Sequence, residues 1–177
     1  IIGAGFVGTS FGKALIKVGH EIMFSSRDPS GMHAQQLRAE TGALVELPET
    51  VLRFSRIKAL AMPPHAVIEV ARDYSGQWGD SILIDMNNRF VHTEVSLAQE
   101  LAEITGAQVV KAFNTIGAEH YLNPDFGGYN ASMLIAGDHA AAKQIVAQLA
   151  AELGFDAVDA GDLHAAAYLE DLARLWV

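Results

Sequence analysis

The sequence of 177 residues has no cysteine. Disulfide bonds, thiolate metal sites and cysteine nucleophiles are therefore excluded. The sequence also has no uninterrupted apolar stretch near the roughly 20 residues that a membrane-spanning helix needs, and no segment resembles a signal peptide. We expect a protein with no membrane segment and, by default, a cytoplasmic location.

Basic residues are scarce. The chain has 12 lysine and arginine residues against 21 acidic residues, which gives a formal net charge of −9. Nucleic acids and anionic membranes are themselves negative, so neither is an expected partner. The seven histidines fall on separate predicted elements and show no spacing typical of metal ligands, so no metal site is expected.

Half of the residues are hydrophobic and 19% are charged, which is the composition of a packed globular protein. A chain of this length forms one sizeable core and is short for two. We therefore expect residues 1–177 to form a single domain. The first two residues, Ile1 and Ile2, are interpreted as the remainder of a strand.

Short apolar runs alternate with amphipathic stretches along the chain. The apolar residues of the longer stretches recur at a spacing near 3.6, as in Val67, Val70, Ala71 and Tyr74, which predicts helices. A helix over residues 140–153 is expected, capped by Asp138 and ended by Gly154 in a left-handed conformation. The expected strands are residues 21–25, 43–46, 57–62, 81–85, 108–111, 132–136 and 155–159.

This alternation predicts an α/β fold, a Rossmann-like doubly wound and mostly parallel sheet with helices on both faces. Most of the expected strands are apolar without strict alternation, which indicates burial of both sheet faces. Ligands of such sheets bind beyond the carboxyl ends of the strands, so the functional residues are expected there.

The segment from Gly3 to Gly8 reads G-A-G-F-V-G, the G-x-G-x-x-G pattern of dinucleotide-binding loops. A strand remnant precedes it, and a helix with Phe11 and Leu15 at core spacing follows. Gly3 would permit the tight turn, Gly5 the approach of the backbone to a pyrophosphate, and Gly8 the packing of helix on strand. N–H groups at the start of that helix would face the phosphates. A glycine-rich connection without a ligand is the alternative.

The end of the next strand distinguishes between cofactors. Ser25, Ser26 and Arg27 stand where an NAD enzyme places an acidic residue to accept from the ribose 2′-hydroxyl. Hydroxyls and a guanidinium can instead donate to a 2′-phosphate, which a carboxylate would repel. Asp28 lies at the expected start of the next helix, past the strand tip. The pattern favours NADP(H), with a solvated surface cation as the alternative reading of Arg27.

Two further strand ends are expected at the same groove. The backbone of Ala61, Met62 and Pro63 would line it, although turn chemistry explains these residues equally well. Asn87 is favoured as a binding residue and Asn88 is not, because adjacent asparagines also form ordinary turns.

Asn114 and Thr115 follow the strand at residues 108–111. An amide and a hydroxyl at a strand tip suit the nicotinamide carboxamide, which both donates and accepts hydrogen bonds. Capping of a following helix is the alternative role of these two residues.

Four segments, IIGAGFVG, SSRD, KAFNT and DAGDLHAAAYLEDLARLWV, resemble the coenzyme F420-dependent NADP oxidoreductase family. They are also similar to the NADPH-binding domain of the STEAP metalloreductases, which belongs to the same wider group. The resemblance covers nearly the whole chain. It implies a Rossmann-like sheet that binds NADP(H) and exchanges hydride between nicotinamide and a deazaflavin or flavin.

The resemblance also implies residue roles. Ser26 and Arg27 would face the 2′-phosphate, and Asn87 and Asn114 would lie near the ribose and nicotinamide. The pyrophosphate loop would consist of Gly3, Gly5, Phe6, Val7 and Gly8.

Direct hydride transfer between two stacked rings needs no protein acid or base, so no catalytic residue is assigned. We expect an NADP(H)-dependent oxidoreductase with a small-molecule redox substrate, either F420 or a flavin-like acceptor. The alternatives are a reductase of a small carbonyl or imine, with Lys111 or His120 as proton donor, and a non-catalytic NADP(H) sensor. The apolar end of the last helix, Leu175, Trp176 and Val177, favours a homodimer.

Overall fold

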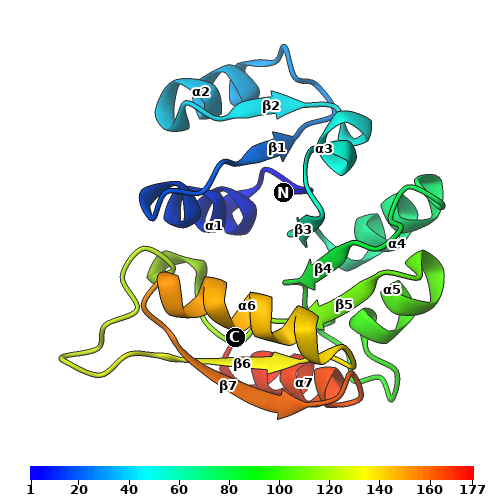
Figure 1. The fold of residues 1–177 in the computed structure, drawn as a ribbon, viewed down its shortest axis with the longest axis vertical. Helices are drawn as coiled ribbons and strands as arrows, with labels where there is room; N and C mark the ends of the chain where they lie inside the picture. The colour runs from blue at the N-terminus through cyan, green and yellow to red at the C-terminus, as the bar shows by residue number, and fades with distance from the viewer.

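Seven short strands lie between helices in the computed structural model, which describes residues 1–177 (Figure 1). The strands are β1 (Met23–Ser25), β2 (Leu44–Glu46), β3 (Ile57–Leu60), β4 (Ile82–Asp85), β5 (Gln108–Lys111), β6 (Ser132–Ala136) and β7 (Asp156–Gly161). The helices are α1 (Phe6–Lys17), α2 (Met32–Thr41), α3 (Pro48–Phe54), α4 (Pro64–Asp73), α5 (Leu97–Thr105), α6 (Ala140–Glu152), α7 (Ala165–Trp176) and the single 3₁₀ turn η1 (Ala118–His120).

The first two residues join the strands into one layer. Ile2 pairs in parallel with Leu60 of β3, and its N–H donates to the Ala59 carbonyl at 2.8 Å. On the other side, the N–H of Ser25 in β1 donates to the Ile1 carbonyl at 2.9 Å. Ile1 and Ile2 therefore occupy the strand position between β1 and β3, as the sequence predicted.

The resulting order is β2, β1, the Ile1–Ile2 segment, β3, β4, β5, β6 and β7. All neighbouring strands pair in parallel except β5 and β6, which are antiparallel. This topology confirms the predicted doubly wound, mostly parallel sheet. Each helix falls short of the length and apolarity that crossing a membrane requires.

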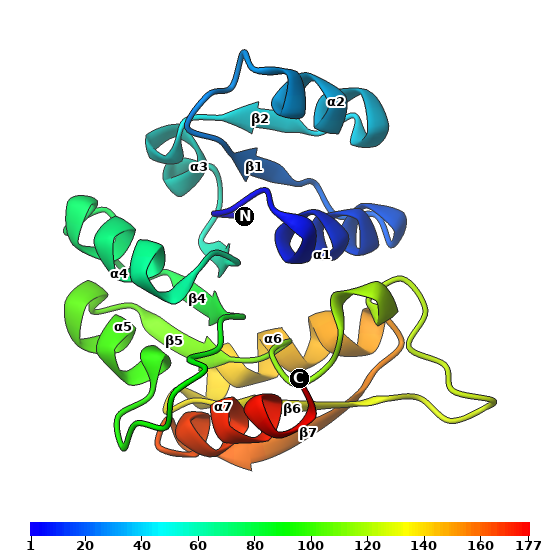
Figure 2. The ribbon, with the colours of Figure 1, turned by 180° about the vertical axis from the view of Figure 1, so that it is seen from behind.

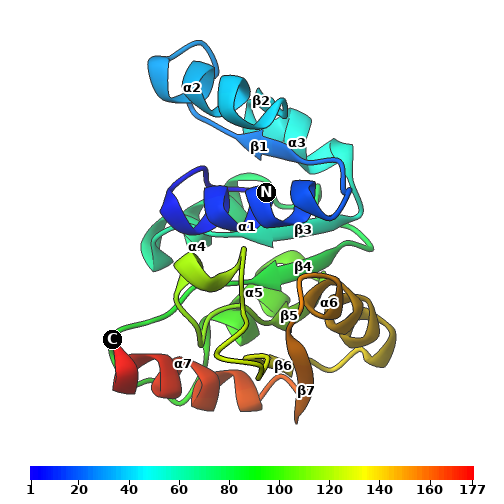
Figure 3. The same cartoon turned by 90° about the vertical axis from the view of Figure 1, so that its left-hand side faces the viewer.

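Helices cover both faces of the sheet (Figure 3). In β4, Ile82 and Ile84 belong to one core cluster with residues of α1 and α6. Leu83, between them, belongs to a second cluster with residues of α4 and α5. Figure 1 shows α6 in front of the sheet, and Figure 2, turned by 180°, shows α7 in front of it. Both faces of the central strands are therefore buried, as expected.

The last strand departs from this pattern. Every residue of β7 is exposed except the half-buried Ala160. The strand lies at the sheet edge and pairs only with β6, and its aspartates Asp156 and Asp159, three residues apart, place a charge on each of its faces. The expectation that strands are buried on both faces is therefore wrong for β7.

The predicted cap of α6 is also wrong. The N-cap of α6 is His139, and no side chain caps the helix. Asp138 instead accepts a hydrogen bond from the Leu163 N–H at 2.8 Å, ahead of α7. The end of α6 is as predicted, because Gly154 follows it with a φ of +92°.

Candidate functional site

A groove with two lobes runs along the carboxyl ends of the strands. The first lobe has a volume of about 730 Å³ and the second about 330 Å³. Both are lined by Gly5, Ala61, Met62 and Pro63, so they form one continuous surface. This is the position at which doubly wound sheets bind their ligands.

Most of the residues singled out from the sequence lie in this groove. The first lobe is lined by Gly3, Gly5, Ser25, Ser26, Arg27, Ala61, Met62 and Pro63. The second lobe is lined by Gly5, Phe6, Val7, Ala61, Met62, Pro63 and Asn87. Segments that lie far apart in the chain therefore meet at one site.

The glycine loop leaves no room for side chains at two positions. Gly3 has a φ of +105°, and a Cβ there would overlap the Ala61 carbonyl oxygen. A Cβ at Gly8 would overlap the Gly3 carbonyl and lie 3.3 Å from the Cβ of Ala61. At Gly5, by contrast, a Cβ would meet nothing within 4 Å. Gly3 and Gly8 thus pack the loop, and Gly5 leaves open space above it.

The start of α1 faces this open space. Gly5 is the N-cap, and no side chain caps the helix by accepting a hydrogen bond from its first N–H groups. The first turn of α1 also contains no acidic residue. Unpaired N–H groups at a helix start carry partial positive charge and bind anions. The loop therefore fits a pyrophosphate.

The tip of β1 supplies a cation without a carboxylate partner. Ser25 is buried and its Oγ accepts from the Gly3 N–H at 3.1 Å, so it supports the turn. Arg27 is exposed and forms none of the ion pairs within 4 Å. Asp28 binds Ser30 at 2.9 Å and does not line the groove. Arg27 is thus free to bind an anion in the first lobe.

The electrostatics of the first lobe are asymmetric. Glu69 and Asp73 of α4 line the wall opposite the β1 tip. Carboxylates repel an anionic ligand group, whereas Arg27 and the start of α1 attract one. An anionic group in this lobe is therefore favoured at the β1 tip and disfavoured against α4.

Two histidines of the first lobe were missed from the sequence. His33 of α2 lines the lobe, and its Nε2 donates to the Ala4 carbonyl of the glycine loop at 2.7 Å. His65 of α4 is exposed and lines the same lobe. No motif spacing links either residue to the loop, so only the fold could reveal them.

Asn87 fixes one wall of the second lobe. Its Oδ1 accepts from the Met62 N–H at 2.8 Å, and its Nδ2 donates to Asp85 Oδ1 at 2.7 Å. The side chain thereby ties the end of β4 to the end of β3. Asn88, which the sequence did not favour, also lines the second lobe.

Asn114 and Thr115 do not line either lobe. Asn114 is 2% exposed, and its Nδ2 donates to Asn88 Oδ1 at 2.8 Å and to the Leu169 carbonyl at 3.1 Å. Its Oδ1 is the one buried side-chain oxygen or nitrogen without a hydrogen-bond partner. Thr115 is half-buried beside it. Asn114 therefore lies behind Asn88, one layer from the groove.

The residue before Asn114 has an unusual backbone. Phe113 has a φ of +60°, the only non-glycine residue with a positive φ. Its carbonyl accepts from the Tyr121 hydroxyl, and its N–H lies 3.1 Å from Met133 Sδ. A phenylalanine with a left-handed backbone conformation is strained and persists only when its surroundings hold it. In this conformation the chain turns so that Asn114 faces α7.

The two candidate proton donors lie in unsuitable places. Lys111 is fully buried between Asp85 and Glu170, at 2.8 and 2.9 Å. The ring of His120 packs against Phe126 with centroids 4.8 Å apart. Neither residue lines a lobe of the groove. Tyr121 is buried as well, and this burial raises the pKa of its hydroxyl above the usual range.

A serine-hydrolase nucleophile turn and a metal site are both absent from the structure. The segment from Gly8 to Gly12 matches the G-x-S-x-G pattern of serine hydrolases, but Ser10 lies inside α1 and not on a strand-to-helix turn. No three histidine, aspartate or glutamate side chains gather where they could hold a metal ion.

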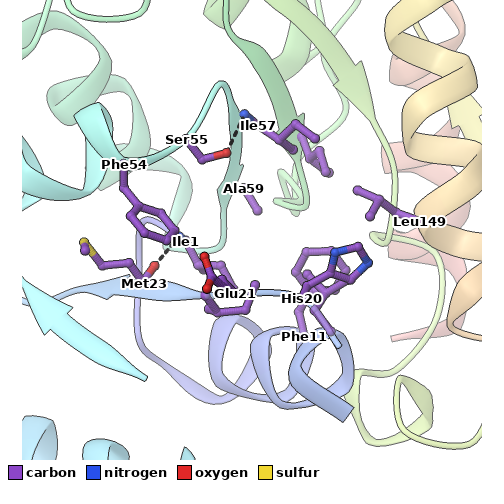
Figure 4. A pocket seen from close by; sticks show the side chains of 13 residues that line it. Ile1, Phe11, His20, Glu21, Met23, Phe54, Ser55, Ile57, Ala59 and Leu149 are labelled. Carbon is purple, nitrogen blue, oxygen red and sulfur yellow. Dashed lines mark hydrogen bonds between the residues drawn. The ribbon is translucent and has the colours of Figure 1, made fainter. Parts of the chain in front are cut away.

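A separate cavity of about 110 Å³ lies near the amino ends of the strands (Figure 4). Its lining is mostly apolar and includes Ile1, Phe11 and Phe54. His20 and Glu21 reach it from the connection between α1 and β1. It shares no residue with either lobe, so it is not part of the groove.

Comparison with known families and proteins identifies the family of the chain. Residues 1–89 match the family described as NADP oxidoreductase, coenzyme F420-dependent. The chain is 28% identical to metalloreductase STEAP3 of Rattus norvegicus, over 96% of this chain and 35% of that protein. It therefore spans about a third of the length of this relative.

Solved structures share the fold. A candidate F420-dependent NADP reductase of Arthrobacter sp. FB24 matches with a TM-score of 0.89 at 27% identity, over 99% of this chain and 89% of that chain. The protein SMa0349 of Sinorhizobium meliloti matches with a TM-score of 0.78 at 26% identity, over 94% and 85%. A reductive aminase of Aspergillus terreus, in complex with NADPH and ethyl levulinate, matches with a TM-score of 0.72 at 21% identity, over 99% and 58%. At that identity the last likeness shows the fold alone.

The glycine loop generates a prediction about stability. We expect Gly8→Ala to lower the free energy of unfolding by about 1–3 kcal/mol, because its Cβ overlaps the Gly3 carbonyl. Gly5→Ala, whose Cβ meets open space, should change it by less than about 0.5 kcal/mol. Urea denaturation of the two variants measures both values. Equal effects at the two positions would contradict the described packing of the loop.

Proposed function

Because the chain belongs to the family of coenzyme F420-dependent NADP oxidoreductases, we propose that residues 1–177 form one NADP(H)-binding domain that catalyses hydride transfer. The proposed second substrate is a deazaflavin such as F420, or a flavin-like acceptor. One observation carries this proposal: the start of α1, with its unpaired N–H groups, lies beside the tip of β1. That tip places Arg27 in the groove and contributes no carboxylate to its lining.

The two lobes suit the two halves of a dinucleotide. In this proposal the adenosine half lies in the larger first lobe and the nicotinamide half in the second. The pyrophosphate crosses the residues that join the lobes, where Gly5, Phe6 and Val7 offer backbone N–H groups at the start of α1. Gly3 and Gly8 hold this loop against Ala61, and Met62 and Pro63 form the opposite wall.

Ser26 and Arg27 would bind the 2′-phosphate. The guanidinium has five donors in a fork that matches phosphate geometry, and Arg27 has no competing ion pair. Ser25 acts indirectly, because its hydroxyl already supports Gly3. The carboxylates of α4 direct the anionic group away from the opposite wall.

Asn87, Asn88, Asn114 and Thr115 would surround the nicotinamide. The unpartnered Oδ1 of Asn114 is an acceptor without a donor, and a buried acceptor in this state is costly. A carboxamide N–H of the bound nicotinamide half would be the donor that this oxygen lacks. Thr115, next in the chain, supplies a hydroxyl beside the same group.

The second lobe favours direct hydride transfer. When bound, NADPH supplies the hydride, and the lining of the lobe includes no titratable side chain. Reduction of a carbonyl needs a proton donor, whereas transfer between stacked rings needs orientation alone. Phe6 and Phe90 are 69% and 61% exposed at this lobe and offer flat apolar surfaces to an acceptor ring.

Two alternatives stay open. A reductase of a small carbonyl or imine would share the groove but would need a proton donor from outside the second lobe. A non-catalytic NADP(H) sensor would share the cofactor site and lack turnover. The acceptor experiment below separates these three functions.

We also propose a homodimer. On α7, Leu172 lies four residues after Tyr168, and Leu175 and Trp176 lie three and four residues after Leu172. These four side chains are 74%, 40%, 84% and 49% exposed, in chain order. Together with Val177, at 73% exposed, they form an apolar stripe. An exposed stripe of this kind is typical of a protein interface.

The 2′-phosphate assignment predicts cofactor selectivity. Arg27→Ala should weaken NADPH binding roughly 10- to 150-fold, the value of a charged hydrogen bond, and leave NADH binding nearly unchanged. Isothermal titration calorimetry with both dinucleotides measures this. Arg56→Ala is the matched control, because Arg56 Nε donates to the Asp80 backbone carbonyl at 2.8 Å and Arg56 lines neither lobe of the groove. Equal losses for NADPH and NADH would defeat the assignment.

The acceptor is tested by stopped-flow measurement of NADPH oxidation. We expect F420, or FMN or FAD, to be reduced faster than quinones, small carbonyls and imines, since the second lobe lacks a proton donor. Turnover with carbonyls or imines alone would favour the first alternative. NADPH binding without oxidation by any acceptor would favour the sensor.

The dimer is tested by sedimentation equilibrium. We expect the protein to be dimeric at micromolar concentration and Leu175→Ser to shift it toward monomer, because a polar group replaces an apolar one in the stripe. Met32→Ser, on an 87% exposed residue of α2, is the control. A monomeric parent protein, or a dimer that Leu175→Ser leaves intact, is the contrary result.

A further inference from the structure

Helix α7 reaches the second lobe through a buried lysine. Oε1 of Glu170 accepts from Lys111 Nζ at 2.9 Å. The same Nζ donates to Asp85 Oδ2 at 2.8 Å and to the Asn87 carbonyl. Asp85 Oδ1 in turn accepts from the N–H and Nδ2 of Asn87. A continuous chain of charged hydrogen bonds therefore connects α7 with a wall of the second lobe.

The preceding residue of α7 reaches the same lobe by a second route. The Leu169 carbonyl accepts from Asn114 Nδ2 at 3.1 Å. Asn114 and Asn88 then exchange two hydrogen bonds, from Asn114 Nδ2 to Asn88 Oδ1 at 2.8 Å and from Asn88 Nδ2 to the Asn114 carbonyl at 2.9 Å. Adjacent residues of one helix thus hold adjacent asparagines of one loop.

The charges of the first route are almost completely removed from water. Lys111 and Asp85 are 0% exposed and Glu170 is 3% exposed. Glu170 also accepts from the N–H of Leu97 at 2.9 Å, at the start of α5, where the helix dipole favours a carboxylate. Buried charges are tolerated only with their partners in place, and removal of one partner leaves the others uncompensated. The arrangement therefore fixes the position of each member.

We propose that Glu170 is a positioning residue for the nicotinamide half of the groove. Acting through Lys111, it holds Asn87 against the ends of β3 and β4, and its helix holds Asn88 through Asn114. This inference rests on the proposed function, because it takes the second lobe as the nicotinamide site. It adds a residue that touches neither lobe and lies outside the segment that matches the family.

A ligand that carries only half of the cofactor tests this proposal. 2′,5′-ADP has the adenosine and 2′-phosphate groups of NADPH but no nicotinamide. We expect Glu170→Gln to weaken NADPH about tenfold, the value of roughly one well-placed hydrogen bond. The same variant should bind 2′,5′-ADP within about twofold of the parent protein, since no residue of the network lines the first lobe. Calorimetric titration of both ligands measures the split.

Two further variants serve as a conservative substitution and as a control. Glu170→Asp keeps the charge but shortens the side chain by one methylene, and it should fold and show a smaller loss in the same direction. Glu103→Gln removes an exposed carboxylate of α5 and should leave both ligands unchanged. If Glu170→Gln does not fold, the Glu170→Asp titration decides the proposal by the same comparison.

The outcomes separate this proposal from the proposed function. Parallel weakening of NADPH and 2′,5′-ADP would mean that Glu170 serves overall stability, and unchanged binding of both would mean that it has no role at the site. Either result overturns the positioning role alone. Failure of the parent protein to bind NADPH or 2′,5′-ADP overturns the proposed function and this inference with it.

Discussion

The contact between the glycine loop and the end of β3 is the constraint on which the groove depends. Gly3 and Gly8 have no space for a Cβ because the Ala61 and Gly3 carbonyls occupy it. The start of α1 is thereby held directly at the strand ends, with its free N–H groups at the edge where the strand tips gather. Without this close packing, an anion-binding helix start and a cation at the β1 tip would not share one surface.

The features that the sequence predicted correctly are those set by near neighbours in the chain. The alternation of apolar runs and amphipathic stretches reflects local periodicity, and it was sufficient for the sheet and its two helix layers. The glycine loop and the tip of β1 follow their strands within a few residues, so a parallel sheet brings them together without further information. Gly154, with its φ of +92°, likewise ended α6 as expected.

The features that the sequence missed depend on partners distant in the chain. Asp138 is a residue type that often caps helices and stands just before α6, yet its carboxylate accepts from the Leu163 N–H, 25 residues away. Asn114 was expected in the groove, but Leu169, 55 residues away, and Asn88 hold it one layer behind. A side chain of this kind has several possible partners of similar strength, and tertiary packing selects among them. Neither spacing nor propensity contains that information.

The two halves of the groove therefore differ in how the chain builds them. The first lobe is lined entirely by residues before position 89, the end of the segment that matches the family. The walls of the second lobe are held from outside that segment, by Lys111, Asn114 and α7. Changes in the later part of the chain can thus alter the second lobe while the first lobe stays intact. The segment that matches the family therefore forms the first lobe, whereas residues outside that segment position the walls of the second lobe.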